Sequence, residues 1–191
     1  MSRSHLRARS GFTRAAAILL LALFTPAVPV AAETTGPTVH LTVAPYVDIP
    51  LPPDSNLFGL GGGIEASALW ELPFCRPLSA GVTGGYRFAP IKRADLGDPG
   101  PVNLLSTAAC LQLQATIAGL VDLGTAASFG YFYAFETGDA SSWATNLMLG
   151  GELHVGYRVN SRLTTGITVT YRNYLRIYHL LDAGVYLTVG L

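Results

Sequence analysis

The sequence predicts an all-β protein, a closed, eight-stranded, antiparallel, up-and-down transmembrane β-barrel. Apolar and polar residues alternate through most of residues 39–190, as they do in strands whose two faces meet different surroundings. Charged residues make up only 13% of the chain, against roughly one quarter in an ordinary soluble domain. No stretch after residue 32 approaches the ~18 consecutive apolar residues of a transmembrane helix. A closed barrel is then the only way into a membrane, because lipid offers no partner for an open sheet edge.

Residues 1–32 have the pattern of a cleaved secretory signal peptide, which leaves residues 33–191 as the barrel domain. Four arginines precede a ten-residue apolar run, residues 15–24, and the small residues Ala31 and Ala32 stand where a signal peptidase would cut. Ten residues are too few to span a bilayer as a helix, which takes about 20. A retained signal anchor is the alternative. The signal predicts export, and with a barrel it predicts the outer membrane of a diderm bacterium.

Eight strands are expected in the exported chain, each at least nine residues long. That is the length a tilted strand needs to cross a membrane. In order they are residues 39–47, 62–72, 78–91, 104–117, 121–135, 146–159, 163–174 and 179–190. Because eight is even, both ends of the barrel domain fall on one side of the membrane.

The connections between these strands alternate in length. Residues 72–76, 118–120 and 160–162 form tight turns, whereas the other set is longer. The longer connections are residues 50–61, 92–102 and 137–145. Outer-membrane barrels have short periplasmic turns and longer outer loops, so the tight turns are expected in the periplasm. The last outer connection, residues 175–178, is as short as a turn, and this pattern does not account for it.

The composition of the two faces predicts that lipid lies outside and the polar face lines the lumen. The polar set consists mainly of small residues such as Ser79, Gly81 and Thr83, which fit the crowded interior of an eight-stranded barrel. The apolar set is aromatic towards its ends, as in the girdles of outer-membrane barrels. The girdle is expected to comprise Trp70, Tyr86, Phe88, Tyr131, Tyr133, Phe135, Tyr157 and Tyr171. The alternative is a soluble, lipocalin-like ligand carrier with its apolar face inward.

Charged residues on the polar face must then sit in the lumen, where each needs a partner of opposite charge. Closing the hairpins on their expected turns sets Asp122 opposite Arg158 and Arg172 opposite Asp182. Diagonal cross-strand neighbours also touch. The lumenal ion-pair candidates are Glu65, Arg87, Asp122, Arg158, Glu152, Arg172 and Asp182.

Two of these candidates, Glu152 and Glu65, are assigned to the lumenal ion pairs because each is a diagonal cross-strand neighbour of an arginine. Glu152 faces Thr170 and lies one diagonal step from Arg172, so we expect Glu152, Arg172 and Asp182 to form one cluster. Glu65 is expected as a diagonal neighbour of Arg87. A lumen filled by such pairs is closed, because eight strands leave little room for a pore. A charged permeation path is the alternative.

No residue pattern points to catalysis, a cofactor, a metal site or nucleic-acid binding. The last strand holds no Ser to complete a triad with His179, and Asp182 lies on the opposite face of that strand. His154 is expected to fill the lumen beside Glu152. Cys75 and Cys110 are expected to be too far apart for a disulfide. The exported chain carries twelve acidic but only eight basic residues, without the basic patch of a nucleic-acid binder.

Taken together, the chain resembles the small eight-stranded bacterial outer-membrane barrels of the outer membrane protein A-like, OmpX-like and OmpW-like kind. The most specific piece is the last strand, where Asp182-x-Gly184-x-x-Leu187-x-Val189 looks like the β-signal read by the barrel-assembly machinery. That family usually ends in Phe or Trp, whereas this chain ends in Leu191. The resemblance implies outer-membrane lipid and the assembly machinery as partners, and a monomer.

The resemblance implies a non-enzymatic integral outer-membrane protein with a structural or surface role. One alternative is a narrow barrel that passes or binds a small hydrophobic ligand. Another is a protein that binds a partner through its outer loops.

Overall fold

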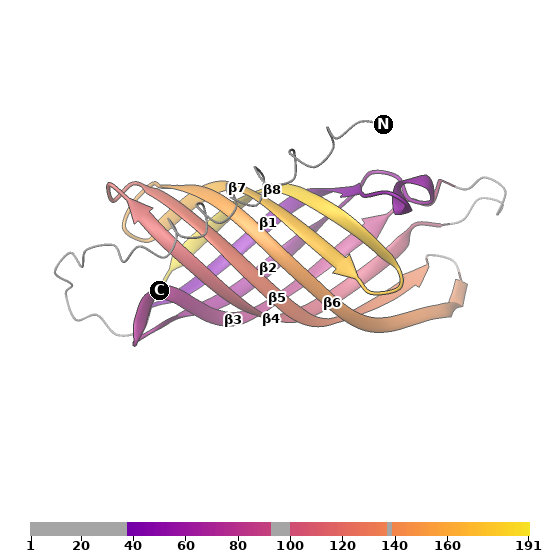
Figure 1. Ribbon diagram of the computed structural model, residues 1–191, viewed down its shortest axis with the longest axis horizontal. Coiled ribbons are helices and arrows are strands. Elements are labelled where there is room, and N and C mark those ends of the chain that lie inside the picture. Colours follow the sequence, from indigo (N-terminus) through magenta and orange to yellow (C-terminus); the bar gives the residue numbers. More distant parts are fainter. Residues whose placement is uncertain (1–37, 93–99, 137–138) are drawn as a thin grey trace, which may run out of the picture. The chain divides into compact units, whose positions relative to one another are not determined.

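The computed structural model describes residues 38–92, 100–136 and 139–191, except for the side chains of residues 139–143, and it is a closed barrel (Figure 1). Each strand pairs antiparallel with the next in sequence, and β8 pairs with β1 to close the ring. The strands are β1 (Val39–Pro50), β2 (Gly61–Leu72), β3 (Cys75–Ala89), β4 (Val102–Ile117), β5 (Val121–Glu136), β6 (Asp139–Arg158), β7 (Leu163–Tyr174) and β8 (Tyr178–Gly190). The predicted fold class is therefore confirmed.

Two strands extend further than the sequence indicated. β6 begins at Asp139 rather than residue 146, so most of the expected 137–145 loop continues the β5–β6 hairpin. Residues 137 and 138, and residues 93–99 of the expected 92–102 loop, lie outside the described residues. β1 continues past its expected end at Val47 as far as Pro50, which places Asp48 within a strand.

The two ends of the barrel differ. The turn end carries the tight β2–β3, β4–β5 and β6–β7 turns together with the first and last strand residues, and the C-terminus marks it in Figure 1. The loop end carries the other connections, including the short 3-10 helix η1 (Asp54–Asn56).

Local chemistry explains two turns at the turn end. At the β4–β5 turn, Ala118 and Gly119 both have positive φ, 51° and 70°, and the Leu120 N–H donates to the Ile117 carbonyl at 3.1 Å. Positive φ at two successive residues is the conformation of a type I′ turn, which matches the twist of the flanking strands. At the β6–β7 turn, the side-chain oxygen of Asn160 accepts the backbone N–H groups of the second and third residues that follow it, at 2.8 and 2.9 Å.

The short β7–β8 connection, which the loop pattern did not account for, is a tight turn of three residues, 175–177. The Ile177 N–H donates to the Tyr174 carbonyl at 2.9 Å, and Arg176 has a φ of 69°. The turn brings Tyr174 and Tyr178 opposite each other, with their rings stacked at 5.6 Å. Both rings are buried, so packing inside the barrel adds to the backbone pairing of the two strands.

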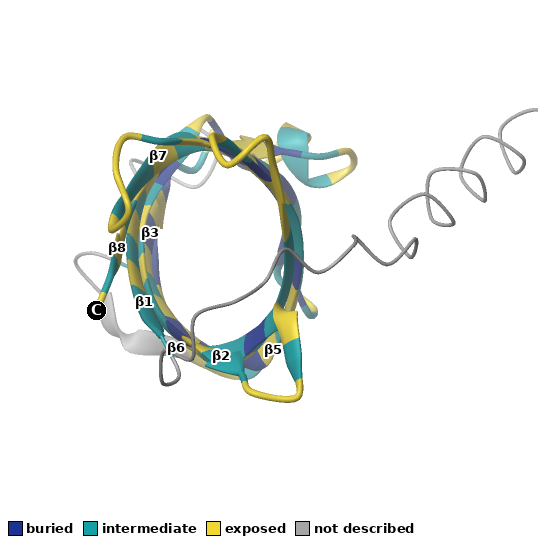
Figure 2. Ribbon diagram, turned by 90° about the vertical axis from the view of Figure 1, so that its left-hand side faces the viewer, coloured by how far each residue is buried: buried dark blue, intermediate teal, exposed yellow. Residues whose placement is uncertain are grey.

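Burial alternates along the strands, as Figure 2 shows in a view into the barrel. Thr83 on β3 is 5% exposed, whereas its neighbour Val82 is 53% exposed. The polar alternate set therefore faces the lumen and the apolar set faces outward. Within the described ranges, no helix is long and apolar enough to cross a membrane.

Candidate functional site

The most densely connected group of charges in the lumen is centred on Arg87 of β3. Its Nη1 donates to Asp182 Oδ1 at 2.7 Å and to Asp48 Oδ1 at 3.1 Å, and its Nη2 lies 3.8 Å from Glu65 Oε2. The side chain is 0% exposed. Three strands, β1, β2 and β8, thus supply carboxylates to one guanidinium group.

Arg172 of β7 extends the same group. Its Nε donates to Asp182 Oδ2 at 2.9 Å, and its Nη2 donates to Glu65 Oε2. Asp182 therefore bridges the two guanidinium groups, one through each carboxylate oxygen. We call these five residues the lumenal charge cluster: Asp48, Glu65, Arg87, Arg172 and Asp182.

The pairing within the lumenal charge cluster is what makes its burial tolerable. An isolated buried charge costs far more free energy than a fold can supply, and it is retained only when it is paired and hydrogen-bonded. Guanidinium groups present several donors in a fixed fork and can satisfy two carboxylates at once. Three carboxylates meet two guanidinium groups here. With all three carboxylates ionised, the cluster carries one excess formal negative charge.

Aromatic rings enclose Arg87 as well. Its guanidinium carbon lies 4.2 Å from the ring centroid of Tyr46 and 5.6 Å from that of Tyr174, within the range of cation–π attraction. The Tyr46 hydroxyl donates to the Tyr86 carbonyl at 3.3 Å. The rings therefore shield the cation and also hold it in position.

On the loop-end side, an apolar cap adjoins the lumenal charge cluster. It is a set of buried side chains that pack on one another, among them two ring pairs: Phe58 with Tyr178 at 4.8 Å and Phe132 with Tyr174 at 5.1 Å. The members of the cap are Phe58, Ala89, Leu104, Ala108, Phe132, Ala134, Met148, Tyr174, Tyr178 and Leu180.

A second charge pair lies at the turn end of the lumen. Arg158 Nε donates to both carboxylate oxygens of Asp122, at 2.9 and 3.0 Å. Two hydroxyls complete the network, since Thr116 and Thr164 each donate to Asp122. Asp122 is 1% exposed and Arg158 39%, which places this pair at the border between the lumen and solvent.

Glu152 does not join Arg172, so the expected cluster of Glu152, Arg172 and Asp182 is wrong in one member. The Glu152 carboxylate instead contacts His154 Nδ1 at 3.1 Å, two residues along the same strand. The His154 ring lies against Gly124, where a Cβ would stand 2.2 Å from the ring nitrogen Nε2. A glycine at this position makes room for the imidazole in the lumen.

Two of the expected hairpin registers are also wrong, each by two residues. Asp122 is opposite Gly156 rather than Arg158, and Asp182 is opposite Thr170 rather than Arg172. The β7–β8 turn is centred on residue 176, one earlier than expected. The β5–β6 pairing around Asp122 is likewise centred one residue earlier than expected, on residue 139 rather than 140. Both arginines nevertheless contact the expected aspartates, because a long side chain reaches its diagonal neighbour. The expected register of Glu152 opposite Thr170 is correct.

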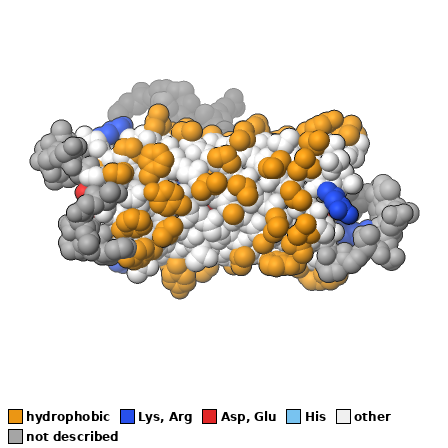
Figure 3. Space-filling model, turned by 180° about the vertical axis from the view of Figure 1, so that it is seen from behind, with side chains coloured by type: hydrophobic (Ala, Val, Ile, Leu, Met, Phe, Trp, Pro, Cys, Tyr) orange, Lys and Arg blue, Asp and Glu red, His pale blue; other side chains and the backbone are white. Residues whose placement is uncertain are grey.

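The aromatic residues expected in the girdle point outward with one partial exception. Seven of them are exposed by 37–60%, whereas Phe135 is half-buried. The exposed ones are Trp70, Tyr86, Phe88, Tyr131, Tyr133, Tyr157 and Tyr171. Figure 3 shows hydrophobic side chains spread along the outer wall, with charged side chains near its ends.

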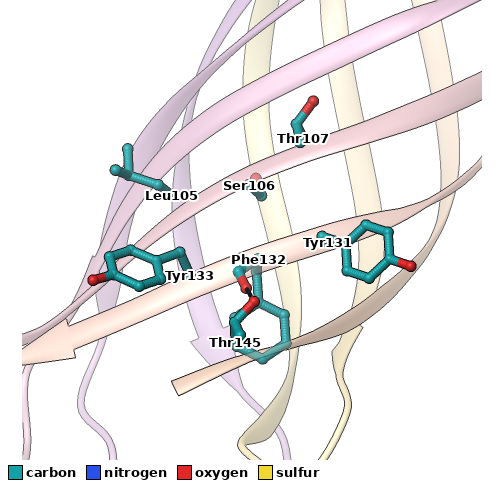
Figure 4. Close-up of a pocket in the computed structure, with 7 residues that line it drawn as sticks. All are labelled: Leu105, Ser106, Thr107, Tyr131, Phe132, Tyr133 and Thr145. Atoms are coloured by element: carbon teal, nitrogen blue, oxygen red, sulfur yellow. Dashed lines mark hydrogen bonds between the residues drawn. The ribbon is translucent and has the colours of Figure 1, made fainter. Parts of the chain in front are cut away.

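A shallow hollow lies on this outer wall between β4, β5 and β6 (Figure 4). Tyr131 and Tyr133 flank it, and Thr145 donates a hydrogen bond to the Phe132 carbonyl at 3.0 Å beneath it. The residues that line it are Leu105, Ser106, Thr107, Tyr131, Phe132, Tyr133 and Thr145. No charged side chain is among them, so the hollow presents aromatic rings, hydroxyls and the aliphatic side chain of Leu105.

At the loop end, His179 has a partner that sequence reasoning missed. Asp54 Oδ2 accepts a hydrogen bond from the His179 backbone N–H at 2.8 Å and lies 3.0 Å from the His179 Nδ1, which ties η1 to the start of β8. Cys75 and Cys110 are both free. Within the described parts of the chain, no three potential metal-ligating side chains come together.

Asp48, Tyr46 and Tyr178 are the main lumenal residues that sequence reasoning missed. The expected first strand stopped at Val47, one residue before Asp48, although the alternation of the polar face continues through His40, Thr42 and Tyr46 to Asp48. Following that alternation to Pro50 would have identified Asp48 as a lumenal acid. Lumenal tyrosines carry no comparable signal, because Tyr is also common in the outer aromatic girdle.

Comparison with known proteins gives structural matches alone. No protein-family model matches the chain, and no curated protein sequence does. Neisserial surface protein A is 16% identical, with a TM-score of 0.58 over 81% of this chain and 97% of that one. The outer membrane protein OprG from Pseudomonas aeruginosa is 11% identical, with a TM-score of 0.52 over 81% and 93% of the two chains.

The Yersinia pestis outer membrane protein Ail, in a phospholipid bilayer nanodisc, is similar to the same degree. It is 11% identical, with a TM-score of 0.51 over 82% of this chain and all of that one. At these identities the matches show a shared fold, that of the small outer-membrane β-barrels, which confirms the resemblance seen in the sequence.

Proposed function

We propose that this chain is a non-enzymatic integral protein of the outer membrane of a diderm bacterium, with a closed lumen and a structural or surface role. One observation carries the proposal: the lumenal charge cluster and the adjoining apolar cap are packed together, and Arg87, Leu104, Tyr174 and Leu180 are all 0% exposed. A lumen filled by paired charges and apolar side chains is a support for the wall rather than a passage.

The outward surface supports the membrane part of the proposal. Alternate strand residues such as Leu153 and Ile167 are 66% and 61% exposed, and exposed apolar area of that extent is avoided by monomers in water. Lysine and glutamate, which would cover the outside of a soluble barrel, are rare on this surface. Outer-membrane lipid is therefore the proposed partner of the wall, and the proposal includes removal of residues 1–32 on export.

The last strand supports a proposed role for the barrel-assembly machinery. β8 pairs with β1 to close the ring, and it carries the Asp182, Gly184, Leu187 pattern that resembles the β-signal. The proposed state is a monomer.

A planar-bilayer conductance experiment on refolded residues 33–191 tests the closed lumen. We expect no stable conductance steps, because the lumenal charge cluster and the apolar cap fill the lumen where they lie. Large, long-lived steps would contradict the closed lumen and favour a permeation path. Heat-modifiable migration on gels, measured on the same sample, establishes that the barrel has folded. Folding to a monomer without detergent would instead favour the soluble, lipocalin-like alternative.

A further inference from the structure

Buried polar atoms that lack a hydrogen-bond partner gather at one place in the lumen, although one of them, Arg87 Nη2, also lies within ion-pair distance of Glu65 at 3.8 Å. Six such side-chain atoms occur in the described parts of the chain, and five of them belong to four residues. They are Asp48 Oδ2, Arg87 Nε and Nη2, and the hydroxyl oxygens of Tyr174 and Tyr178. Each of these four side chains is at least 98% buried. Buried polar groups are nearly always hydrogen-bonded, so this concentration needs a physical cause.

The four residues are neighbours at the boundary between the lumenal charge cluster and the apolar cap. Arg87 contacts Asp48 directly and lies over the Tyr174 ring. The Tyr174 and Tyr178 rings stack with an interplanar angle of 17°. The four side chains that carry the unpartnered atoms are therefore contiguous.

The mixture of unpartnered atoms defines the chemistry of a guest. Arg87 offers only donors, Asp48 Oδ2 is an acceptor when ionised, and each tyrosine hydroxyl can do either. A metal cation would satisfy the oxygen atoms but would be repelled by the guanidinium group. An anion would be repelled by Asp48. A water molecule donates and accepts, and buried waters typically make about three hydrogen bonds of this kind.

We propose that Asp48, Arg87, Tyr174 and Tyr178 form a binding site for buried water. The bound water links the lumenal charge cluster to the tyrosine hydroxyls of the apolar cap. The packed end of the lumen is thus hydrated at its centre, although it is closed to bulk solvent. The site satisfies the donors of Arg87 that its carboxylate partners do not reach.

Replacement of either tyrosine by phenylalanine distinguishes a hydrated site from a dry one, because the effects have opposite signs. In a hydrated site Tyr174→Phe and Tyr178→Phe each remove a hydrogen bond to water. The folding equilibrium constant of residues 33–191 in lipid vesicles, measured by urea titration, should then fall by on the order of 5- to 10-fold. In a dry site the same change removes an unpaired buried hydroxyl, and the constant should stay the same or rise. The matched control is Tyr171→Phe on the outward face, with an expected change below about 2-fold.

A direct measurement completes the test. In perdeuterated protein in lipid nanodiscs, the Arg87 Nε–H should show NMR cross-relaxation to a long-lived water, and this signal should weaken in the Tyr174→Phe, Tyr178→Phe double variant. The proposal requires both results. Unchanged or increased stability of the phenylalanine variants, or an Arg87 Nε–H without a water cross-peak, would overturn it. A folding constant that depends on sodium rather than choline chloride at equal ionic strength would also overturn it, in favour of a bound cation.

Discussion

At the scale of single residues, Arg172 shows how much the lumen depends on pairing. It contacts Asp182 on the adjacent β8 and Glu65 on β2, which is not its neighbour in the sheet. The second contact crosses the lumen and therefore joins two parts of the wall that share no backbone hydrogen bonds. An ion pair of this kind acts as a strut inside the barrel.

Removal of Arg172 should destabilise the barrel strongly. Arg172→Ala leaves Glu65 and Asp182 buried with one cation fewer, and breaking a buried pair by deleting one partner typically costs about 3–5 kcal/mol. Arg172→Met, which restores bulk without charge, should remain strongly destabilised. Unfolding in urea, followed by tryptophan fluorescence in lipid vesicles, measures the loss.

The adjacent residue supplies the control for this prediction. Tyr171 points outward and is 43% exposed, so Tyr171→Ala should lose contact with lipid but strand no charge. Its cost should be clearly smaller than that of Arg172→Ala. Equal losses at positions 171 and 172 would contradict the assignment of the two faces.

The same residues show what the sequence could and could not predict of the site. Alternation placed Glu65, Arg87, Arg172 and Asp182 in the lumen, because period 2 fixes the face of every strand residue. The Arg172–Glu65 contact was beyond reach, since hairpin pairing relates only neighbouring strands. The partner of Glu152 was wrong for a related reason: cross-strand distance alone does not reveal that His154, on its own strand, competes for the carboxylate.

At the scale of elements, the strands were predictable and the exact turns less so. Strand length and alternation follow from the barrel wall and its two unlike faces, and these signals run over ten or more residues. A turn centre depends on one or two residues. At the β7–β8 connection, stacking of Tyr174 on Tyr178 sets the closure, and tertiary packing of that kind leaves no mark in the local sequence.

The β4–β5 turn is suboptimal in a way that can be tested. Ala118 has a φ of 51°, a left-handed conformation that Asn adopts more readily than Ala and that β-branched residues resist. Ala118→Asn, which creates the favoured Asn-Gly pair with Gly119, should stabilise the barrel by up to about 1 kcal/mol, because the left-handed conformation costs most L residues roughly 1–2 kcal/mol and costs Asn less.

A matched substitution at the same position has the opposite expected sign. Ala118→Val places a β-branched side chain at positive φ and should be destabilising. Urea midpoints of the two variants and of the unchanged protein, measured side by side, give the comparison. Stabilisation by Val, or no difference between Asn and Val, would mean that this turn does not hold its left-handed conformation in solution.

At the scale of the whole molecule, the outward-facing rings mark where the wall would meet the surfaces of the proposed membrane. Trp70 lies near the turn end of β2 and is 44% exposed, whereas Tyr133 lies on β5 towards the loop end. If both are girdle residues, the apolar band between them spans the hydrocarbon core.

Fluorescence quenching can test the position of Trp70. In lipid vesicles its emission should resist aqueous iodide but respond to lipids brominated at a shallow position, because a girdle ring sits at the level of the headgroups. The protein also contains Trp143, so the measurement requires a Trp143→Phe background. Ready quenching by iodide would place Trp70 outside the membrane.

The seam between β1 and β8 has a consequence for how the protein reaches its native state. It pairs His40 with Gly190, the two extremes of the strand order, so no local hairpin can nucleate it. The other strand pairings join neighbours in sequence, so this seam is the one whose closure costs the most chain entropy, and such non-local pairing is slow to form. Until the seam forms, two strands keep unpaired edges, which lipid does not tolerate and which invite pairing with other chains. If the barrel spans a membrane as proposed, insertion and closure must occur together, and pairing of the final strand sets the moment at which the protein can enter the bilayer.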